Sequence, residues 1–292
     1  MLSIRKEFIY YLKNSNRDFL AIGKEAFESG ELSAKDYLTL CYLRLHCNRS
    51  GQICITVKGI CEGIGYSAKS GKASMPNQIR NTLFGLLLEE ALYYKEDDRR
   101  ANNTLNITLD LEHEIFIPVG SFVKIYSDEF AKITESDYRY KDKMLAVLIA
   151  VKIHINTSGY CYCSEKTIEN TASIACSITH NTVNAILDKL TDNGIIACYK
   201  IGSYIDADGK LRRFPNFYGE MGQQMDKQEI ISIAKGIIRR KHITIDSFIP
   251  VRDGIQDKEL LDGLFGNGDC IPSARPPPKL RRNGLCNCWP LV

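Results

Sequence analysis

One order of sequence features occurs twice in the chain. Around Asn48-Arg49-Ser50-Gly51, and again around Asn156-Thr157-Ser158-Gly159, an apolar helical run ends in a polar Ser-Gly turn. In both places a short strand-like piece follows, then a small helix, a second helix, and two strand-like pieces around a charged loop. That order predicts a helix-turn-helix followed by a β-hairpin. Because one such pattern is a weak signal, the second copy is what makes the prediction specific.

The apolar positions of the two copies keep one spacing. Four pairs are separated by the same 104 positions: Ile79 and Val183, Leu83 and Leu187, Leu86 and Leu190, Leu92 and Ile196. Within each copy they recur mostly at steps of three and four, so we expect them on the buried face of a helix and on the strand that follows. The polar residues between them do not match. Two domains with matching apolar cores and different exposed surfaces would give this pattern.

The chain of 292 residues is long enough for two domains. We expect a mainly helical α+β protein with small β-hairpins, in which two helix-turn-helix domains precede a helical, partly disordered C-terminal extension. The predicted divisions are an N-terminal extension (1–18), a first domain (19–113), a second domain (120–219), a helical extension (220–265) and a disordered tail rich in Gly, Pro and Arg (266–292).

Local signals place several boundaries within this plan. Ser33 is a good N-cap for a helix over 34–46, and Ser177 is expected to open the second long helix of the second domain. Gly194 suits the left-handed end of that helix. Further predicted segments are a short helix or strand over 4–12, a small helix over 57–63, and hairpin strands over 195–201 and 211–218 around a tip at 202–210.

Composition excludes several classes of protein. No apolar run approaches the roughly 20 residues that a membrane span needs, and residues 1–18 contain no apolar stretch like that of a signal peptide. We therefore expect a cytoplasmic protein without a membrane partner. Most of the 11 cysteines have apolar neighbours and are expected to pack as free thiols, Cys54 among them. The Cys-x-Cys spacing at Cys161 and Cys163 does not match a structural zinc site, so no metal is expected.

Sequence motifs of common enzymes are missing from the chain. It has no phosphate-binding Gly-Lys-Ser/Thr loop, no His-Glu-x-x-His and no Gly-x-Ser-x-Gly. Its five histidines are scattered, and His154 in an apolar helix is expected to be a core residue. We expect no catalytic residue and no cofactor.

The outward face of the second helix in each copy carries polar side chains. In a helix-turn-helix this helix lies in the DNA major groove, and its N-terminal half meets the base edges. Asn and Gln can bind adenine through two hydrogen bonds, and Arg can bind guanine. The candidates for base contact are Asn77, Gln78, Arg80 and Asn81 in the first copy, and Thr179, His180, Asn181 and Asn184 in the second.

Other polar residues suit the DNA backbone or minor groove. These candidates are Lys69, Lys72, Ser74, Arg99 and Arg100 in the first copy, and Ser177, Lys210, Arg212 and Arg213 in the second. The net charge is only +3, which favours selective binding through a few contacts over tight non-specific binding. Acidic residues near both hairpin tips, including Asp206 and Asp208, would repel phosphate and favour protein contact or solvation there.

Both copies resemble winged-helix domains over about Phe19 to Tyr218. The resemblance rests on the Ser-Gly turn, the helix opening Ser164-Glu165-Lys166-Thr167-Ile168, and Leu190-Thr191-Asp192-Asn193-Gly194-Ile195-Ile196 leading into the wing. The tandem arrangement is similar to DNA-binding replication initiators and regulators of Gram-positive plasmids, phages and mobile elements. The first copy departs from the pattern through an inserted stretch at 68–73 and through Glu89-Glu90, where a Gly stop is expected.

The resemblance implies duplex DNA as the ligand. We expect non-catalytic, sequence-selective binding, with replication initiation on a mobile element as the first expectation and operator binding by a transcription regulator as an alternative. An alternative of another class is a protein-interaction module. In that case the apolar helix at 226–240 would contact a second copy of the chain or a replication or transcription protein.

Overall fold

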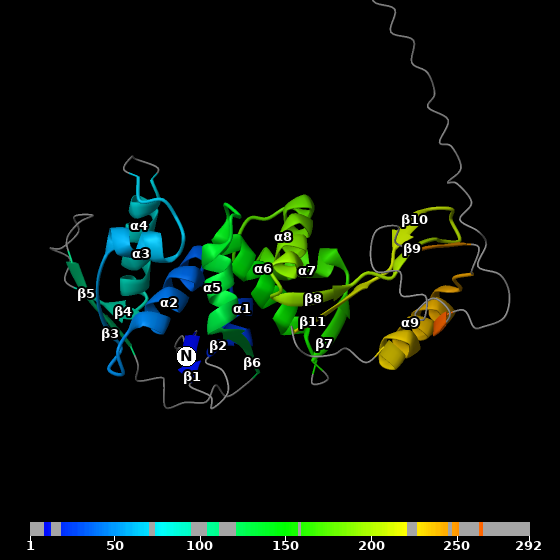
Figure 1. Ribbon diagram of the computed structural model, residues 1–292, viewed down its shortest axis with the longest axis horizontal. Helices are drawn as coiled ribbons and strands as arrows, with labels where there is room; N and C mark the ends of the chain where they lie inside the picture. Colours follow the sequence, from blue (N-terminus) through cyan, green and yellow to red (C-terminus); the bar gives the residue numbers. More distant parts are fainter. Residues whose placement is uncertain are drawn as a thin grey trace, which may run out of the picture.

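The computed structural model describes residues 9–12, 19–69, 74–94, 104–110, 121–156, 159–220, 227–244, 247–250 and 263–264. Within these residues the chain is a mixed α+β protein whose strands form small antiparallel sheets of three strands each. Figure 1 shows an elongated molecule, in which a first unit, a central sheet, a second unit and the C-terminal elements follow one another along the long axis. The expected α+β class is confirmed.

The central sheet joins the two halves of the chain. Its strand order is β1-β2-β6, with β1 at Ile9–Leu12, β2 at Phe19–Gly23 and β6 at Phe122–Tyr126. The antiparallel register places the first residue of one strand opposite the last of the other: Phe19 faces Tyr126, and Phe122 faces Gly23. The two matching strand openings therefore pair with each other about an approximate two-fold axis. Part of the predicted N-terminal extension, β1, belongs to this sheet.

The first unit follows β2 with two helices and then the predicted series of elements. These are α1 (Lys24–Glu28), α2 (Ala34–His46), β3 (Gln52–Thr56), α3 (Val57–Gly63), α4 (Met75–Leu88), β4 (Leu92–Tyr93) and β5 (Thr104–Leu109). The strand order is β3-β5-β4, so the last strand is central. Ser33 caps α2 in a reciprocal arrangement with Asp36, as the sequence predicts.

The second unit repeats this order after β6. Its elements are α5 (Ser127–Glu135), α6 (Lys141–His154), β7 (Tyr160–Cys163), α7 (Glu165–Ala172), α8 (His180–Asp192), β8 (Ile196–Tyr199) and β11 (Asn216–Glu220). The last strand is again central, in the order β7-β11-β8. All four residue pairs with the 104-position separation are buried, as predicted.

The described residues of the two Ser-Gly turns make corresponding contacts, which supports the repeat. The Asn48 N–H donates to the Gln52 carbonyl over 2.9 Å, and the Asn156 N–H donates to the Tyr160 carbonyl over 3.0 Å. Gly51 and Gly159 adopt the left-handed φ values of 73° and 83° that such a turn requires. The two turns therefore share this hydrogen bond and a left-handed glycine.

The second long helix of each unit also ends in the same way. Gly194 has φ 59°, as predicted, and Glu90 occupies the corresponding position with φ 56°. The next residues, Ala91 and Ile195, donate their N–H groups to the Leu86 and Leu190 carbonyls over 3.0 and 2.9 Å. The first unit thus forms the left-handed helix end with a residue that has a Cβ, which costs about 1 kcal/mol.

The two units share one continuous hydrophobic core, in which α2 packs against α6. In each unit, the turn between the short and long helices also contacts the start of the first long helix of the other unit. The Tyr66 hydroxyl accepts the Lys141 N–H and donates to Asp142 Oδ1, both over 3.0 Å, at the N-terminus of α6. In return the Ala34 N–H of α2 donates to the Ala175 carbonyl over 2.9 Å. Reciprocal contacts of this kind hold the two units in one arrangement.

A buried ion pair joins the second unit to the central sheet. Lys152 Nζ lies 2.8 Å from Glu129 Oε2 and 3.3 Å from Glu220 Oε1, and the Lys152 and Glu129 side chains are 2% and 3% exposed. The same ammonium donates to the Lys124 carbonyl over 2.8 Å. A buried charge needs such partners, so Lys152 fixes α6 to α5, β6 and β11.

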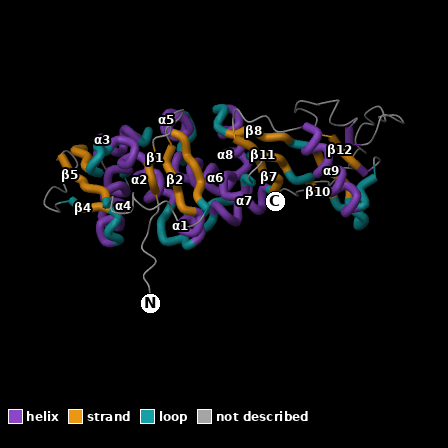
Figure 2. The backbone as a smooth tube through the Cα atoms, turned by 90° about the horizontal axis from the view of Figure 1, so that it is seen from below, coloured by secondary structure: helices purple, strands orange, loops and turns teal. Residues whose placement is uncertain are grey.

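The C-terminal extension builds on the second hairpin. The interval between β8 and β11 contains β9 (Gly202–Ile205) and β10 (Leu211–Arg213), and β12 (Phe248–Pro250) pairs with β9 in the order β10-β9-β12. Helix α9 (Lys227–Lys241) covers this sheet, and Figure 2 shows these elements together at one end of the molecule. A second core forms here, with Tyr204 and Phe214 packed with Ile230, Ala234 and Ile237.

This arrangement corrects three expectations. The predicted strand over 195–201 is present as the shorter β8, but the one over 211–218 is divided into β10 and β11, and the predicted tip at 202–210 contains β9. The extension at 220–265 contains a strand as well as a helix. In the 226–240 segment Ile230, Ile231 and Ile237 are buried and Ile233 and Ile238 are half-buried, so this apolar face packs within the chain itself. β9 and β10 form a hairpin of their own, and the pairing of β12 with β9 joins segments that are distant in sequence.

Smaller corrections concern one helix start and one cysteine. Helix α8 begins at His180 with Thr179 as its N-cap, so Ser177 does not open it. Cys54 is exposed, while Cys41, Cys61 and Cys161 are buried as expected. The predicted tail at 266–292 lies outside the described residues. Among the described helices, none has the length and apolar character needed to cross a bilayer.

Candidate nucleic-acid interface

Helix α8 has one buried apolar face and one exposed polar face. Val183, Ile186, Leu187 and Leu190 bury one face in the common core. Asn181 projects from the opposite face and is exposed. The Thr179 side chain accepts the Thr182 N–H over 3.4 Å and so fixes the start of the helix. The first turn of α8 therefore presents polar side chains on a well-anchored helix.

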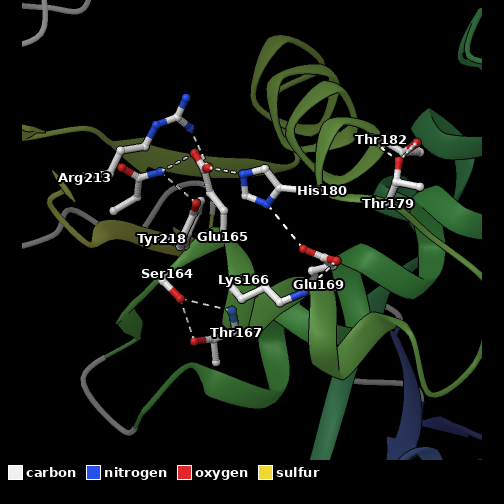
Figure 3. Close-up of polar contacts among 11 residues, drawn as sticks. Ser164, Glu165, Lys166, Thr167, Glu169, Thr179, His180, Thr182, Arg213 and Tyr218 are labelled. Atoms are coloured by element: carbon white, nitrogen blue, oxygen red, sulfur yellow. Dashed lines mark hydrogen bonds and ion pairs between the residues drawn. The ribbon is translucent and has the colours of Figure 1, made fainter. Parts of the chain in front are cut away.

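A polar cluster at Glu165 connects α7, α8 and the hairpin (Figure 3). Arg213 Nη1 donates to Glu165 Oε2 over 2.6 Å, and His180 Nε2 lies 3.3 Å from the same oxygen. Asn216 donates from Nδ2 to Glu165 Oε1 over 3.4 Å and to the Tyr218 hydroxyl over 2.9 Å. One carboxylate at the start of α7 thus contacts residues from three other elements.

His180 also contacts a second carboxylate of α7. Its Nδ1 atom lies 3.3 Å from Glu169 Oε2, while Lys166 Nζ donates to Glu169 Oε1 over 2.8 Å. The hydrogen bond from Lys166 holds the pKa of Glu169 below its usual value, and the nearby His180 acts in the same direction. The imidazole therefore lies between two acidic groups, and this fixes the first residue of α8 against α7.

The hairpin tip is closed by an aspartate. Asp206 Oδ1 accepts the backbone N–H groups of Asp208 and Lys210 over 3.1 and 2.8 Å. Its other oxygen accepts Arg212 Nε over 2.8 Å, and this bond lowers the pKa of Asp206. The Asp206 charge expected to repel phosphate is thus used to form the turn, whereas Lys210 is exposed at the tip.

More of the base-contact candidates are hydrogen-bonded to other side chains in the first unit than in the second. Arg80 Nη1 donates to Asn77 Oδ1 over 2.8 Å, and Lys35 donates to Gln78 Oε1. These α4 residues are half-buried, whereas Asn81 is exposed. By the 104-position spacing, Asn77 is the counterpart of exposed Asn181. In the second unit Asn184 is half-buried, with an amide oxygen that has no hydrogen-bond partner within the described residues.

The backbone-contact candidates are distributed over both units. Lys69 is exposed in the segment between α3 and α4, and Ser74 is the N-cap residue of α4. Ser177 is exposed, and its carbonyl accepts Lys143 Nζ over 2.7 Å. Arg212 and Arg213 are exposed but ion-paired. Lys72, Arg99 and Arg100 lie outside the described residues.

Glu165 and Glu169 were not predicted as site residues. Glu165 directly follows the N-cap Ser164, so the sequence shows only a common helix-start residue. Its contact with Arg213 joins residues 48 positions apart, and no local pattern indicates that pairing. Elsewhere, Cys161 and Cys163 place their Sγ atoms 3.9 Å apart, and within the described residues no group of three potential ligands is arranged to hold a metal.

Comparisons with models of known protein families and with curated protein sequences find no match to this chain.

Proposed function

We propose that the two units are winged-helix modules and that the protein binds duplex DNA selectively, without catalysis. The observation that carries this proposal is the repeated order of helix, strand, helix, helix, strand and strand, with the last strand central in each sheet. In this order α4 and α8 take the place of the helix that enters the major groove.

The approximate two-fold arrangement supports simultaneous use of both units. The symmetric register of β2 and β6 relates one unit to the other. Figure 1 shows α4 and α8 in the upper part of the molecule, with the central sheet below. Half-sites in duplex DNA are commonly related by a two-fold axis, so a pseudo-symmetric protein fits a pseudo-palindromic site.

The second unit is the stronger candidate for base readout. Asn181 is exposed in the first turn of α8, whereas its counterpart Asn77 accepts a hydrogen bond from Arg80. A free amide can make the two hydrogen bonds that distinguish adenine. We infer that α8 reads bases, and that the first unit reads a different half-site or holds the backbone.

The process that best suits such binding is replication initiation on a plasmid, phage or mobile element. Binding to an operator by a transcription regulator uses the same surface and remains the alternative. The two are separated by where on its own replicon the protein protects DNA from cleavage in a footprinting experiment: at an origin, or at a promoter.

The test of DNA readout begins with selection of bound sequences from a random duplex pool, followed by affinity measurement. Asn181→Ala should weaken binding to the selected duplex by about 10-fold or more while changing binding to random duplex little, because base contacts carry specificity. Lys210→Ala should weaken both to a similar extent.

Asn77→Ala is the matched control on α4, and we expect it to reduce selectivity less than Asn181→Ala. The opposite ranking would assign base readout to α4. If no duplex binds even at low salt, the DNA proposal is wrong.

A further inference from the structure

A groove lies between the second hairpin and the C-terminal end of α9. Its lining combines basic, acidic and apolar side chains: Tyr204, Asp206, Ala207, Asp208, Arg212, Arg240 and Lys241. Figure 1 shows the hairpin and α9 at the end of the molecule farthest from the first unit. The groove is therefore outside the region between α4 and α8.

The two walls of the groove are fixed to each other. Strand β12, which follows α9, pairs with β9 so that Phe248 faces Tyr204. Ile230, Ala234 and Ile237 of α9 belong to the same buried core as Tyr204. Packing and strand pairing together place the basic end of α9 against the hairpin, although the two are distant in sequence.

The charges of the groove favour an anionic ligand. Three cations line it against two carboxylates; Arg212 and Asp206 pair with each other over 2.8 Å, which leaves Arg240 and Lys241 against Asp208. Arg240 donates from Nε to the Gly236 carbonyl over 3.2 Å. Within the described part of the chain, its terminal nitrogens and the Lys241 ammonium have no acidic partner. Exposed Lys210 adds a fourth cation at the hairpin tip.

We propose that this groove binds the phosphate backbone of duplex DNA that flanks the segment contacted by α8. The proposal rests on the proposed DNA-binding function and adds the C-terminal extension to the binding surface. Arg240 and Lys241 supply the contacts from α9, and Lys210 supplies one from the hairpin. Such contacts increase affinity and fix the position of the duplex without reading its sequence.

The experiment measures fluorescence anisotropy with a labelled random-sequence duplex of about four helical turns, roughly 40 base pairs, over a series of salt concentrations. Each phosphate contact contributes about 0.9 to the log–log slope of affinity against salt. Arg240→Gln and Lys241→Gln should each reduce the slope by about 1. The matched control is Arg239→Gln, which removes the same charge from a neighbouring residue of α9 that does not line the groove.

The outcomes separate this proposal from the function on which it rests. A slope reduced by the groove variants and unchanged by Arg239→Gln supports the groove. Equal slopes for all three variants, with normal binding by the unmodified protein, overturn the groove alone. No duplex binding by the unmodified protein overturns both. Because all three side chains are exposed, unchanged thermal unfolding will verify that the variants fold.

Discussion

The two units of this protein have the same interior and different exteriors. The buried positions of α4 and α8 correspond along both helices, and Gly51 and Gly159 both have left-handed φ values. Thr56 and Ser164, the N-caps of the short helices, are separated by 108 positions, whereas Ile79 and Val183 in the long helices are separated by 104. The first unit therefore has extra residues between its short and long helices. The second unit carries an elaborated hairpin and α9.

This comparison teaches that a repeated fold does not imply a repeated site. Burial constrains side-chain size and spacing, so one core pattern serves both units. Surface turns tolerate insertion, so the outward features can differ. Four experiments, each based on one or two substitutions, test how far the two units differ in stability.

The largest effect is expected at the buried charge of the second unit. Lys152→Ala leaves Glu129 buried without its cation and should lower the free energy of unfolding by about 3–5 kcal/mol in urea denaturation. Lys189→Ala breaks an exposed pair with Asp137 in the same unit and should cost under about 1 kcal/mol. Similar losses for both variants would show that the buried pair does not anchor the second unit.

The contact between the units is tested at Gly65, in the first unit's helix-to-helix turn. A Cβ on this residue, which has φ +77°, would lie 1.9 Å from the Thr134 carbonyl oxygen of the second unit. Gly65→Ala should therefore cost about 3 kcal/mol through strain and overpacking. Gly209→Ala is the control, because Gly209 has φ +74° but nothing within 4 Å of the added Cβ. It should cost only about 1 kcal/mol, and equal costs would argue against close docking.

The helix ends offer an experiment in the opposite direction. Glu90→Gly removes the Cβ from a left-handed residue and should stabilise the first unit by about 1 kcal/mol. Gly194→Ala should destabilise the second unit by a similar amount. A destabilised Glu90→Gly protein would show that the two helix ends are not equivalent. Thermal unfolding is sufficient for both measurements.

The smallest effect concerns pH. Burial of the ring lowers the pKa of His154 below 6.5 in the folded protein, and the nearby Lys24 acts in the same direction. The unfolded chain therefore takes up the proton first as pH falls, so this residue reduces stability below about pH 6.5 and has no such effect well above it. His154→Gln should flatten the dependence of unfolding free energy on pH between pH 8 and 5. An unchanged pH dependence would contradict this role.

Local patterns predicted many elements correctly. Ser33 caps α2, the small helix over 57–63 has the predicted bounds, and Gly194 adopts the predicted left-handed conformation after α8. These features depend on neighbours a few residues away. The predicted start of α8 at Ser177 was wrong, because Thr179 is an equally suitable cap residue and is the one that caps the helix.

For the candidate site, the sequence located the exposed first turn of α8 but not what holds it in place. Asn181 was recognised because its position follows from the helical period. The contacts of Glu165 with Arg213 and His180 were not, since they join three separate elements. Nor does any local signal reveal that α9 covers the second hairpin.

The sequence alone determined the repeat, the buried faces and the order of elements, because burial imposes a period on nearby residues. Only the tertiary structure decided that β2 pairs with β6 about a two-fold axis, that each helix-to-helix turn contacts the other unit, and that the apolar face of α9 is covered within the chain. Those contacts join residues far apart in sequence, and their geometry depends on how whole elements pack.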